Sequence, residues 1–282
     1  MEIKSLKNVS FDIIFEGFSK AFAKYELQLT KEELLVMINR RGFVAELSFG
    51  AFVNDKLVSF TFNGIGSFNG LKTAYDTGTG TTEEYRGQGL ASKIFAYSVP
   101  FLKEQGVTQY LLEVLQHNTK AVSIYTKAGF EVSREFNYFV EEQKNIQFHS
   151  KELSNDYSIK QTKLNEKLMT EFFDFNPSWQ NSFDAILRKP DDFKVIGAFN
   201  EQELVGYCIF EPTSGDVTQI AVNKEYRRKG IGTNLLKEAF KLNLHNAVKL
   251  INSEIDCESI NGFLKANSIS STGKQFEMIK EL

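Results

Sequence analysis

The order of apolar and polar positions predicts a series of helices and strands that occurs twice along the chain. Apolar residues recur near helical spacing from Phe11 to Tyr25, and Thr30 with Glu33 three residues on is a capping box that opens a second helix. Hairpin turns are expected at Asn54-Asp55 and Asn69-Gly70. The other elements expected in this half are an extended stretch over 72–82, helices over 87–101 and 119–128, and strands over 109–115 and 130–141.

The polar and charged stretch 141–157 is the expected linker between two domains, 1–150 and 151–282. Beyond it the same order of elements returns. The expected elements are a strand over 158–162, a helix over 168–173, a hairpin turning at Asn200-Glu201, a strand over 216–222, a helix from Arg227 and a strand near Val248. This recurrence at very long period indicates duplication of one domain.

Composition narrows the class of protein. The chain has 282 residues, 42% hydrophobic and 24% charged, which is enough apolar surface for two cores. The net charge is −3 and no run of Lys or Arg is long enough for a phosphate backbone, so we expect no nucleic-acid partner. No stretch approaches the roughly 18 apolar residues of a bilayer span, and the N-terminal stretch has no apolar signal core.

Cysteine and histidine usage gives no metal site. Cys208 and Cys257 fall outside any metal-ligand spacing, and His117, His149 and His245 are scattered. We therefore expect a reduced, cytoplasmic chain that holds no metal. We also expect the protein to be a monomer or a homodimer.

The repeat contains two matching segments that carry the candidate chemistry. Residues 84–91 read EYRGQGLA and residues 225–232 read EYRRKGIG, and each follows an extended stretch and opens an amphipathic helix. A helix N-terminus leaves backbone N–H groups unpaired and carries partial positive charge, so it suits phosphate. Small residues at 87, 89 and 91 let the backbone approach a diphosphate closely. The segment has neither the ending of a nucleotide P-loop nor the spacing of a dinucleotide fold.

These residues resemble the GNAT superfamily of N-acetyltransferases, whose acyl-CoA signature is [Q/R]-x-x-G-x-[G/A]. Downstream of the first copy, Leu112-Glu113-Val114, Asn118, Ala121, Tyr125 and Gly129-Phe130 look like the family's L-E-V…N-x-x-A-x-x-x-Y-x-x-x-G-F stretch. The resemblance covers residues 43–141 well and 194–240 more loosely. It implies an α/β (α+β) fold of two tandem domains, each a mixed, mostly antiparallel central sheet flanked by helices, with strands splayed for CoA.

The resemblance also implies the roles of particular residues. It assigns acetyl-CoA binding to Gly80, Thr81, Thr82, Arg86, Gly87, Gln88, Gly89, Leu90, Ala91 and Asn118. It makes Tyr125 the group that protonates the departing thiolate, and Asn118 a residue that holds the pantetheine arm or nearby backbone. Tyr125 lies two helical turns after Asn118 on the same face, although core filling remains an alternative for its ring.

Transfer of an acetyl group to an amine requires a base and an oxyanion donor, because the amine is mostly protonated at neutral pH. Glu113 is centred in an apolar strand, where desolvation would raise its pKa. Asp76 and His117 are alternative bases, and Glu113 can also be a solvated strand residue. The oxyanion donor is expected to be a backbone N–H around Gly80 to Thr82.

The second copy keeps the turn but departs from the pattern after it. In one register Leu264 stands in place of Tyr125, Cys257 in place of Asn118 and Asn252 in place of Glu113. Leu cannot donate a proton, so we expect this domain to lack the chemistry.

The leading hypothesis is an enzyme whose domain 1–150 acetylates a primary amine of a small molecule by direct attack on acetyl-CoA. A peptide N-terminus is an alternative acceptor. Other hypotheses are a non-catalytic module that binds acyl-CoA or a protein partner, and a dimerisation scaffold.

Overall fold

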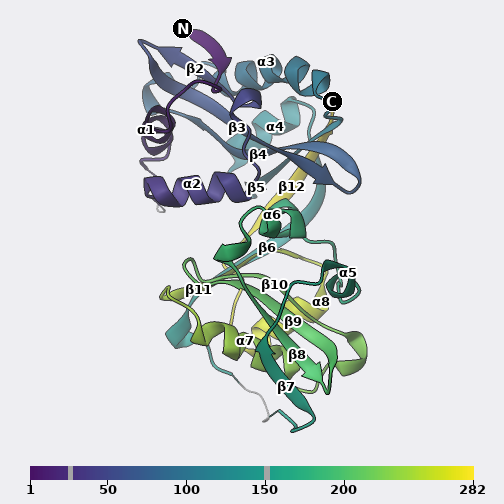
Figure 1. Cartoon of the computed structure of the whole chain (residues 1–282). Helices are drawn as coiled ribbons and strands as arrows, with labels where there is room; N and C mark the ends of the chain where they lie inside the picture. Colours follow the sequence, from purple (N-terminus) through teal and green to yellow (C-terminus); the bar gives the residue numbers. More distant parts are fainter. Residues whose placement is uncertain (25–27, 149–152) are drawn as a thin grey trace. The chain divides into compact units, whose positions relative to one another are not determined.

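The computed structural model describes residues 1–24, 28–148 and 153–282 (Figure 1). It divides into two compact units, an N-terminal unit of Met1–Ser133 with Glu277–Leu282, and a C-terminal unit of Arg134–Phe276. The boundary between the two compact units lies at Ser133–Arg134. The polar stretch 141–157 lies inside the sequence range of the C-terminal unit, and the last six residues of the chain belong to the N-terminal unit. The division of function between 1–150 and 151–282 stays a prediction.

Antiparallel hairpins build most of the sheet of the N-terminal unit. The strands are β1 (Glu2–Ser5), β2 (Phe49–Val53), β3 (Lys56–Phe68), β4 (Leu71–Thr81) and β5 (Gln109–Leu115), with the first residues of β6 (Glu131–Glu142) and the last of β12 (Gly273–Glu281). Neighbours from β1 to β4 pair antiparallel, whereas β5 pairs parallel to β4. A parallel neighbour requires a crossover connection, and helix α3 (Leu90–Glu104) supplies it.

Helices pack against both faces of this sheet. Helices α1 (Phe11–Ala21) and α2 (Lys31–Arg40) share a core with Phe60 and Phe62 of β3. Helix α3 packs against Phe49 and Val58. Helix α4 (Thr119–Lys127) follows β5. Because alternate residues of a strand face opposite sides, the near-continuous burial of β3 reflects this double covering.

The C-terminal unit repeats the plan. Its strands are β7 (Tyr157–Gln161), β8 (Lys194–Asn200), β9 (Glu203–Glu211), β10 (Asp216–Val222) and β11 (Ala247–Glu254), and its helices are α5 (Glu166–Thr170), α6 (Phe183–Leu187), α7 (Ile231–Lys241) and α8 (Glu258–Ala266). Strands β7 to β10 pair antiparallel, β11 pairs parallel to β10, and β6 from Phe136 onward pairs antiparallel with β11. The predicted fold class, a mixed and mostly antiparallel sheet flanked by helices in each of two units, is confirmed.

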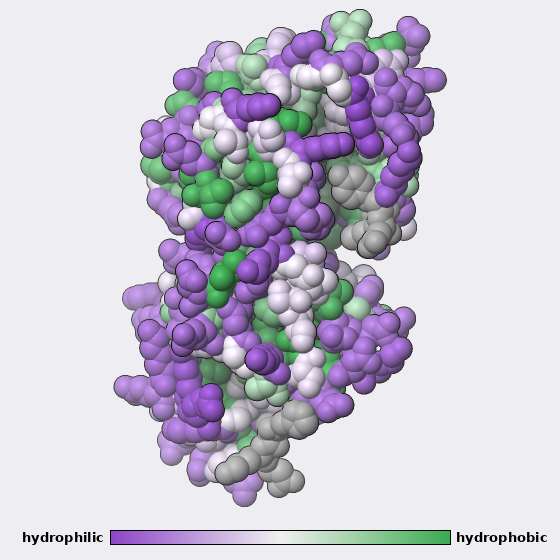
Figure 2. Space-filling model, turned by 180° about the vertical axis from the view of Figure 1, so that it is seen from behind, coloured by the Kyte–Doolittle hydropathy of each residue, from purple (hydrophilic) through white to green (hydrophobic). Residues whose placement is uncertain are grey.

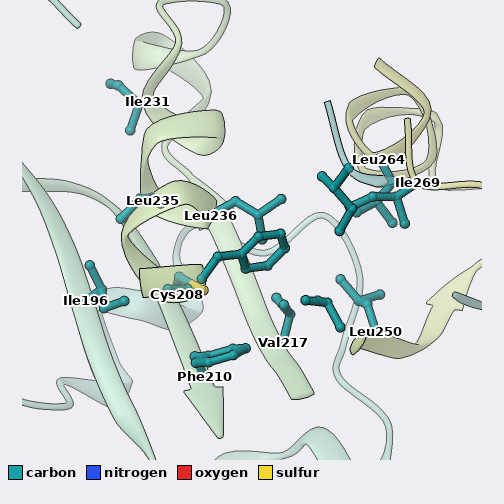
Figure 3. Packing of buried hydrophobic residues seen from close by; sticks show 14 of the residues in the cluster. Ile196, Cys208, Phe210, Val217, Ile231, Leu235, Leu236, Leu250, Leu264 and Ile269 are labelled. Carbon is teal, nitrogen blue, oxygen red and sulfur yellow. The ribbon is translucent and has the colours of Figure 1, made fainter. Parts of the chain in front are cut away.

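Buried hydrophobic residues of α7, α8 and the strands form one core cluster of the C-terminal unit (Figure 3). Leu235 and Leu236 of α7 point toward the strands that carry Cys208, Phe210 and Val217. Leu264 of α8 is 1% exposed and joins the same core.

Several local expectations are confirmed. Thr30 and Glu33 form the reciprocal capping box. The turns at Asn54-Asp55 and Asn69-Gly70 have positive φ at both residues, as a type I′ hairpin turn requires. The helix expected to run to Tyr25 ends at Ala21, and Tyr25 lies outside the described residues, as does His149.

Polar residues cover most of the face seen in Figure 2, with hydrophobic areas between them. Among the described residues, no helix combines the length and the apolar character needed to cross a membrane.

Candidate active site of the N-terminal unit

Strands β4 and β5 diverge in the middle of the N-terminal sheet. They pair at only three positions, Thr73–Gln109, Ala74–Tyr110 and Tyr75–Leu111. Strand β4 nevertheless stays paired with β3 as far as Thr81. The edge of β4 that faces β5 is therefore open from Asp76 onward, as expected for strands that admit a ligand.

The turn after β4 is held by the Arg86 side chain. Its Nε donates to Thr81 O at 3.0 Å, and its Nη2 donates to Ala21 O at 2.7 Å. Both acceptors are backbone carbonyls, so Arg86 fixes the turn against the end of β4 and the end of α1. This geometry gives Arg86 a positioning role in the described structure.

Two glycines bring the chain from this turn into α3. Gly87 and Gly89 have φ of 77° and 71°, a region that L side chains adopt at a cost. Apart from the glycine itself and the residues next to it in the chain, no atom lies within 4 Å of a Cβ built on either glycine, so the turn is open on its outer side. Gly89 is the N-cap of α3 and provides no side-chain cap. The first amides of a 15-residue helix are thus presented at an open turn, which fits a diphosphate. Gln88 is exposed beside them.

A small cavity of about 20 Å³ joins this helix end to Tyr125. Ala91 and Ser92 of α3, Tyr125 of α4 and Asp76 of β4 all line it. Leu90, by contrast, is 4% exposed and packs in the core with Phe49, so its side chain anchors the helix. The structure therefore places the first turn of α3 and the Tyr125 side chain beside one space between the divergent strands.

Tyr125 forms a hydrogen bond with a buried carboxyl group. Its hydroxyl donates to Asp76 Oδ2 at 3.2 Å. Asp76 also accepts from Thr79 Oγ1 at 2.7 Å and from the Gly78 amide at 2.9 Å. Burial raises the pKa of Asp76, although these hydrogen bonds and Arg41 act in the opposite direction. Asp76 thus orients Tyr125 and is itself held on three sides.

Glu113 lies on β5 and is contacted from the neighbouring strand. Tyr75 donates its hydroxyl to Glu113 Oε2 at 3.1 Å. Burial raises the pKa of Tyr75 well above its usual value, and the charge of Glu113 adds to the shift. Successive residues of a strand face opposite sides, so Tyr75 and Glu113 lie on the side of the sheet opposite to Asp76 and Tyr110. The carboxylate is half-buried, whereas His117 is exposed in the turn before α4.

The backbone amides expected to stabilise an oxyanion are not equivalent. The amide of Thr82 donates to Val58 O at 2.9 Å, so this expected donor is engaged in pairing with β3. Amides alternate in direction along an antiparallel strand, which directs Gly80 to β3 and Thr81 to the open edge. A Cβ on Gly80 would lie 2.6 Å from Phe60, so this glycine is required by packing.

Asn118 is the N-cap of α4, and its side chain accepts from the Ala121 amide at 3.3 Å. The Asn118 side chain thus holds the backbone at the start of α4, and its contact with a pantetheine arm stays a prediction. Thr79, Ser92, Phe95 and Tyr110 were not predicted as site residues, although they line the cavity with Tyr125. Strand β4 has a bulge between Asp76 and Gly78, so Thr79 faces the same side of the sheet as Asp76. Simple alternation along the strand would place Thr79 on the opposite side, and the sequence gives no sign of the bulge.

The C-terminal unit repeats the turn before the helix, but it lacks counterparts of the Asn118 cap and the Tyr125 hydroxyl. Arg227 Nε donates to Val222 O at 2.9 Å, the same contact that Arg86 makes five residues back. Gly230 has φ of 82° and caps α7 as Gly89 caps α3. Cys257 is the N-cap of α8 and makes no side-chain cap, and Leu264 is buried in the core.

Comparison with known proteins agrees with this geometry. The model of the acetyltransferase (GNAT) family matches residues 11–130 and 161–257. The chain belongs to this family. Each matched range contains one copy of the turn, at 84–91 and at 225–232. This GNAT protein is therefore a tandem acyltransferase enzyme, as the sequence motifs indicated.

Individual relatives extend the picture. The GNAT chain is 30% identical over 131 residues to N-alpha-acetyltransferase 30 of Schizosaccharomyces pombe, a match that covers 44% of this chain and 87% of the relative. A tandem GNAT protein from the clavulanic acid biosynthesis pathway superposes with a TM-score of 0.73 at 12% identity, covering 99% of this chain and 98% of the other. A GCN5-related N-acetyltransferase from Sphaerobacter thermophilus gives 0.72 at 13% identity, covering 99% and 95%.

Proposed function

We propose that the N-terminal unit transfers an acetyl group from acetyl-CoA to a primary amine, and that the amine belongs to a small molecule. The observation that supports this proposal is the single cavity on which the first turn of α3 and Tyr125 both open. A diphosphate bound at Gly87 to Ala91 leaves the rest of the ligand to run between β4 and β5, toward that hydroxyl. The GNAT family implies acetyl-CoA as the cosubstrate.

In the proposed reaction, the amine loses its proton on one face of the sheet and the thiolate gains a proton on the other face. The acceptor amine approaches from the side of Glu113, which takes its proton, and its nitrogen then attacks the thioester carbon. The carbon–sulfur bond breaks on the side of Tyr125, whose hydroxyl gives a proton to the thiolate. The Thr81 amide, at the open edge of β4, stabilises the developing oxyanion. In this scheme Asp76 positions Tyr125 and is not the base, because it already accepts three hydrogen bonds.

Tyr125→Phe tests the assignment of the acid. The variant and the wild type are incubated with acetyl-CoA and a panel of a polyamine, an amino sugar, amino acids and peptides, and acetylated products are measured by mass spectrometry. General acid catalysis contributes about 10²–10⁴-fold, so kcat should fall by about that factor while KM for acetyl-CoA changes little. Tyr97→Phe is the matched control, because Tyr97 is an exposed residue of α3 outside the cavity. An unchanged kcat in Tyr125→Phe would remove Tyr125 as the acid.

A peptide N-terminus is the second candidate acceptor, and one observation favours it. The relative with 30% identity is named an N-alpha-acetyltransferase. The panel separates the two candidates, since acetylation of peptides at the α-amine with no product from free amino acids or amino sugars would replace the small-molecule proposal.

A further inference from the structure

Helix α3 carries a stripe of exposed residues with an apolar middle and a charge at each end. The stripe consists of Lys93, Tyr97, Pro100, Phe101 and Glu104, which recur at helical spacing and therefore share one face. All five residues are exposed. Tyr97 is 41% exposed and Phe101 is 39% exposed, so two aromatic rings lie side by side at the surface. Clustered exposed rings of this kind favour a contact with another surface.

The two exposed rings of the α3 stripe are supported by a buried ring beneath them. The ring centroids of Tyr97 and Phe101 lie 5.4 Å apart. Both rings also contact Phe49 of β2, which is 1% exposed, with centroid distances of 5.5 and 5.1 Å. Rings that are already packed lose little conformational freedom when a second surface covers them. Aromatic residues are enriched at the centres of protein interfaces, so this pair favours a protein as the covering partner.

The charges at the two ends of the stripe are opposite to those that the helix itself favours. Lys93 lies in the first turn of α3, and Glu104 is its last residue. A helix carries partial positive charge at its N-terminal end and partial negative charge at its C-terminal end, so each side chain lies at the less favourable end. Neither side chain forms an ion pair with another residue of the part of the chain that the structure describes. The stability of α3 alone therefore does not account for this arrangement of charges.

The α3 stripe is complementary to a second copy of itself in antiparallel orientation. The midpoint between Lys93 and Glu104 lies within one residue of the midpoint between Tyr97 and Phe101. A two-fold axis through this point places Lys93 of each chain opposite the partner's Glu104, and brings the four rings together in the middle. At a rise of 1.5 Å per residue, the charged residues lie about 8 Å from the axis, at the rim of the aromatic centre. Antiparallel packing also sets the positive end of each helix beside the negative end of the other.

We propose that α3 forms the interface of a symmetric homodimer, in which two copies of this chain pack their α3 stripes antiparallel. The rings supply the apolar contact, and the two Lys–Glu pairs fix the direction of packing. The contact between two 15-residue helices is smaller than the roughly 1,200–2,000 Å² of a stable interface, so the dimer is a weak one that forms between about 10 µM and 1 mM. This inference is independent of the proposed function, because it is tested by association and not by acetyl transfer.

Charge reversal tests the pairing. Lys93→Glu and Glu104→Lys are made separately in the full chain, and association is measured by sedimentation velocity across that concentration range. Each single variant places like charges opposite each other twice in the dimer, so its Kd should rise by about tenfold or more. Each change also brings the charge that the helix dipole favours to its end of α3, so the temperature of thermal unfolding should not fall. Weaker association without lower stability separates an interface from a role within the helix.

An equimolar mixture of the two variants identifies the antiparallel arrangement. One chain then has Glu at both ends of the stripe and the other has Lys at both ends, so the antiparallel pair regains two contacts between opposite charges. The mixture, and a chain that carries both changes, should return to the wild-type Kd within about threefold. Lys103→Glu is the matched control, because it makes the same charge change at an exposed position of α3 outside the stripe. Its Kd should equal that of the wild type.

The apolar part of the stripe has its own pair of variants. Tyr97→Ser should raise the Kd by about tenfold or more, as loss of a central interface ring does. Leu71→Ser removes a side chain that is 48% exposed and lies outside α3, and it should leave association unchanged. A wild-type chain that stays monomeric throughout the concentration range would overturn the inference and leave the stripe to a partner of another kind. A dimer that tolerates both single charge reversals, or a mixture that fails to restore association, would overturn it as well.

Discussion

Removal of the last six residues should destabilise the N-terminal unit, although they are farthest from it in sequence. Glu277–Leu282 belong to that unit. Met278 is 1% exposed, Ser133 Oγ donates to Glu277 Oε1 at 2.8 Å, and the Leu282 amide donates to Thr108 O at 2.9 Å. Lys280 Nζ donates to Ala128 O, directly after the helix that carries Tyr125. The deletion thus removes a buried side chain and several hydrogen bonds next to the candidate site.

The magnitude follows from these contacts. Truncating a buried Met to Ala costs about 2–5 kcal/mol, and each lost hydrogen bond adds about 1 kcal/mol. A domain is stable by only about 5–15 kcal/mol, so chain 1–276 should have a largely unfolded N-terminal unit or a much lower urea midpoint. Met278→Ala alone should cost about 2–5 kcal/mol, and Glu281→Ala, at an exposed position, should cost little.

The sequence contains one tryptophan, Trp179, which lies in the C-terminal unit, so fluorescence reports that unit and circular dichroism reports both. In chain 1–276 a dichroism transition should move to lower urea ahead of the fluorescence transition. Coincident and unshifted transitions, with acetyl transfer at the wild-type rate, would show that the six residues do not support the N-terminal unit.

Three other predictions concern single residues. Gly80→Ala should cost about 1–3 kcal/mol in urea unfolding, because its methyl would overlap Phe60, whereas Gly78→Ala should be tolerated, since the nearest atom to its Cβ lies at 3.7 Å. Burial raises the pKa of Asp76 above its unfolded value, so its contribution to stability is greatest at low pH and is lost as pH rises through the folded pKa. Asp76→Asn should therefore flatten the decline in unfolding free energy from about pH 4 upward, and an identical pH profile would contradict this. Burial raises the pKa of the Cys208 thiol, so a thiol reagent should label Cys257 in the native chain and reach Cys208 only on unfolding.

Local sequence signals predicted the elements well where the determining contacts are also local. The capping box at Thr30 and the positive-φ turn at Asn69-Gly70 depend on neighbours within four residues, and both are confirmed. The helix expected from Gly87 begins at Leu90, because Gly87 and Gly89 adopt positive φ and form the turn itself. The assignment of Glu277–Leu282 to the N-terminal unit has no local signal, since it depends on pairing partners more than a hundred residues away.

The same distinction applies to the site. The motif located the turn, and the resemblance indicated Tyr125, but only tertiary structure shows that Asp76 accepts its hydroxyl and that Tyr75 contacts Glu113. Cavity volume is a further property that a motif does not encode. Two turns of matching sequence and backbone geometry open on spaces of about 20 and 980 Å³, because the side chains that surround them come from other elements.

The small volume of the cavity in the N-terminal unit bears on how this unit would admit a ligand. In the N-terminal unit, Phe95, Tyr110 and Phe130 pack edge-on or tilted around the candidate site, with ring centroids 5.1–5.6 Å apart. Under the proposed function, a thioester bound between the strands would have to displace part of this cluster, because the cavity has a volume of only about 20 Å³. Some binding energy is then used to open the site, which lowers the apparent affinity in proportion to the fraction of molecules already open.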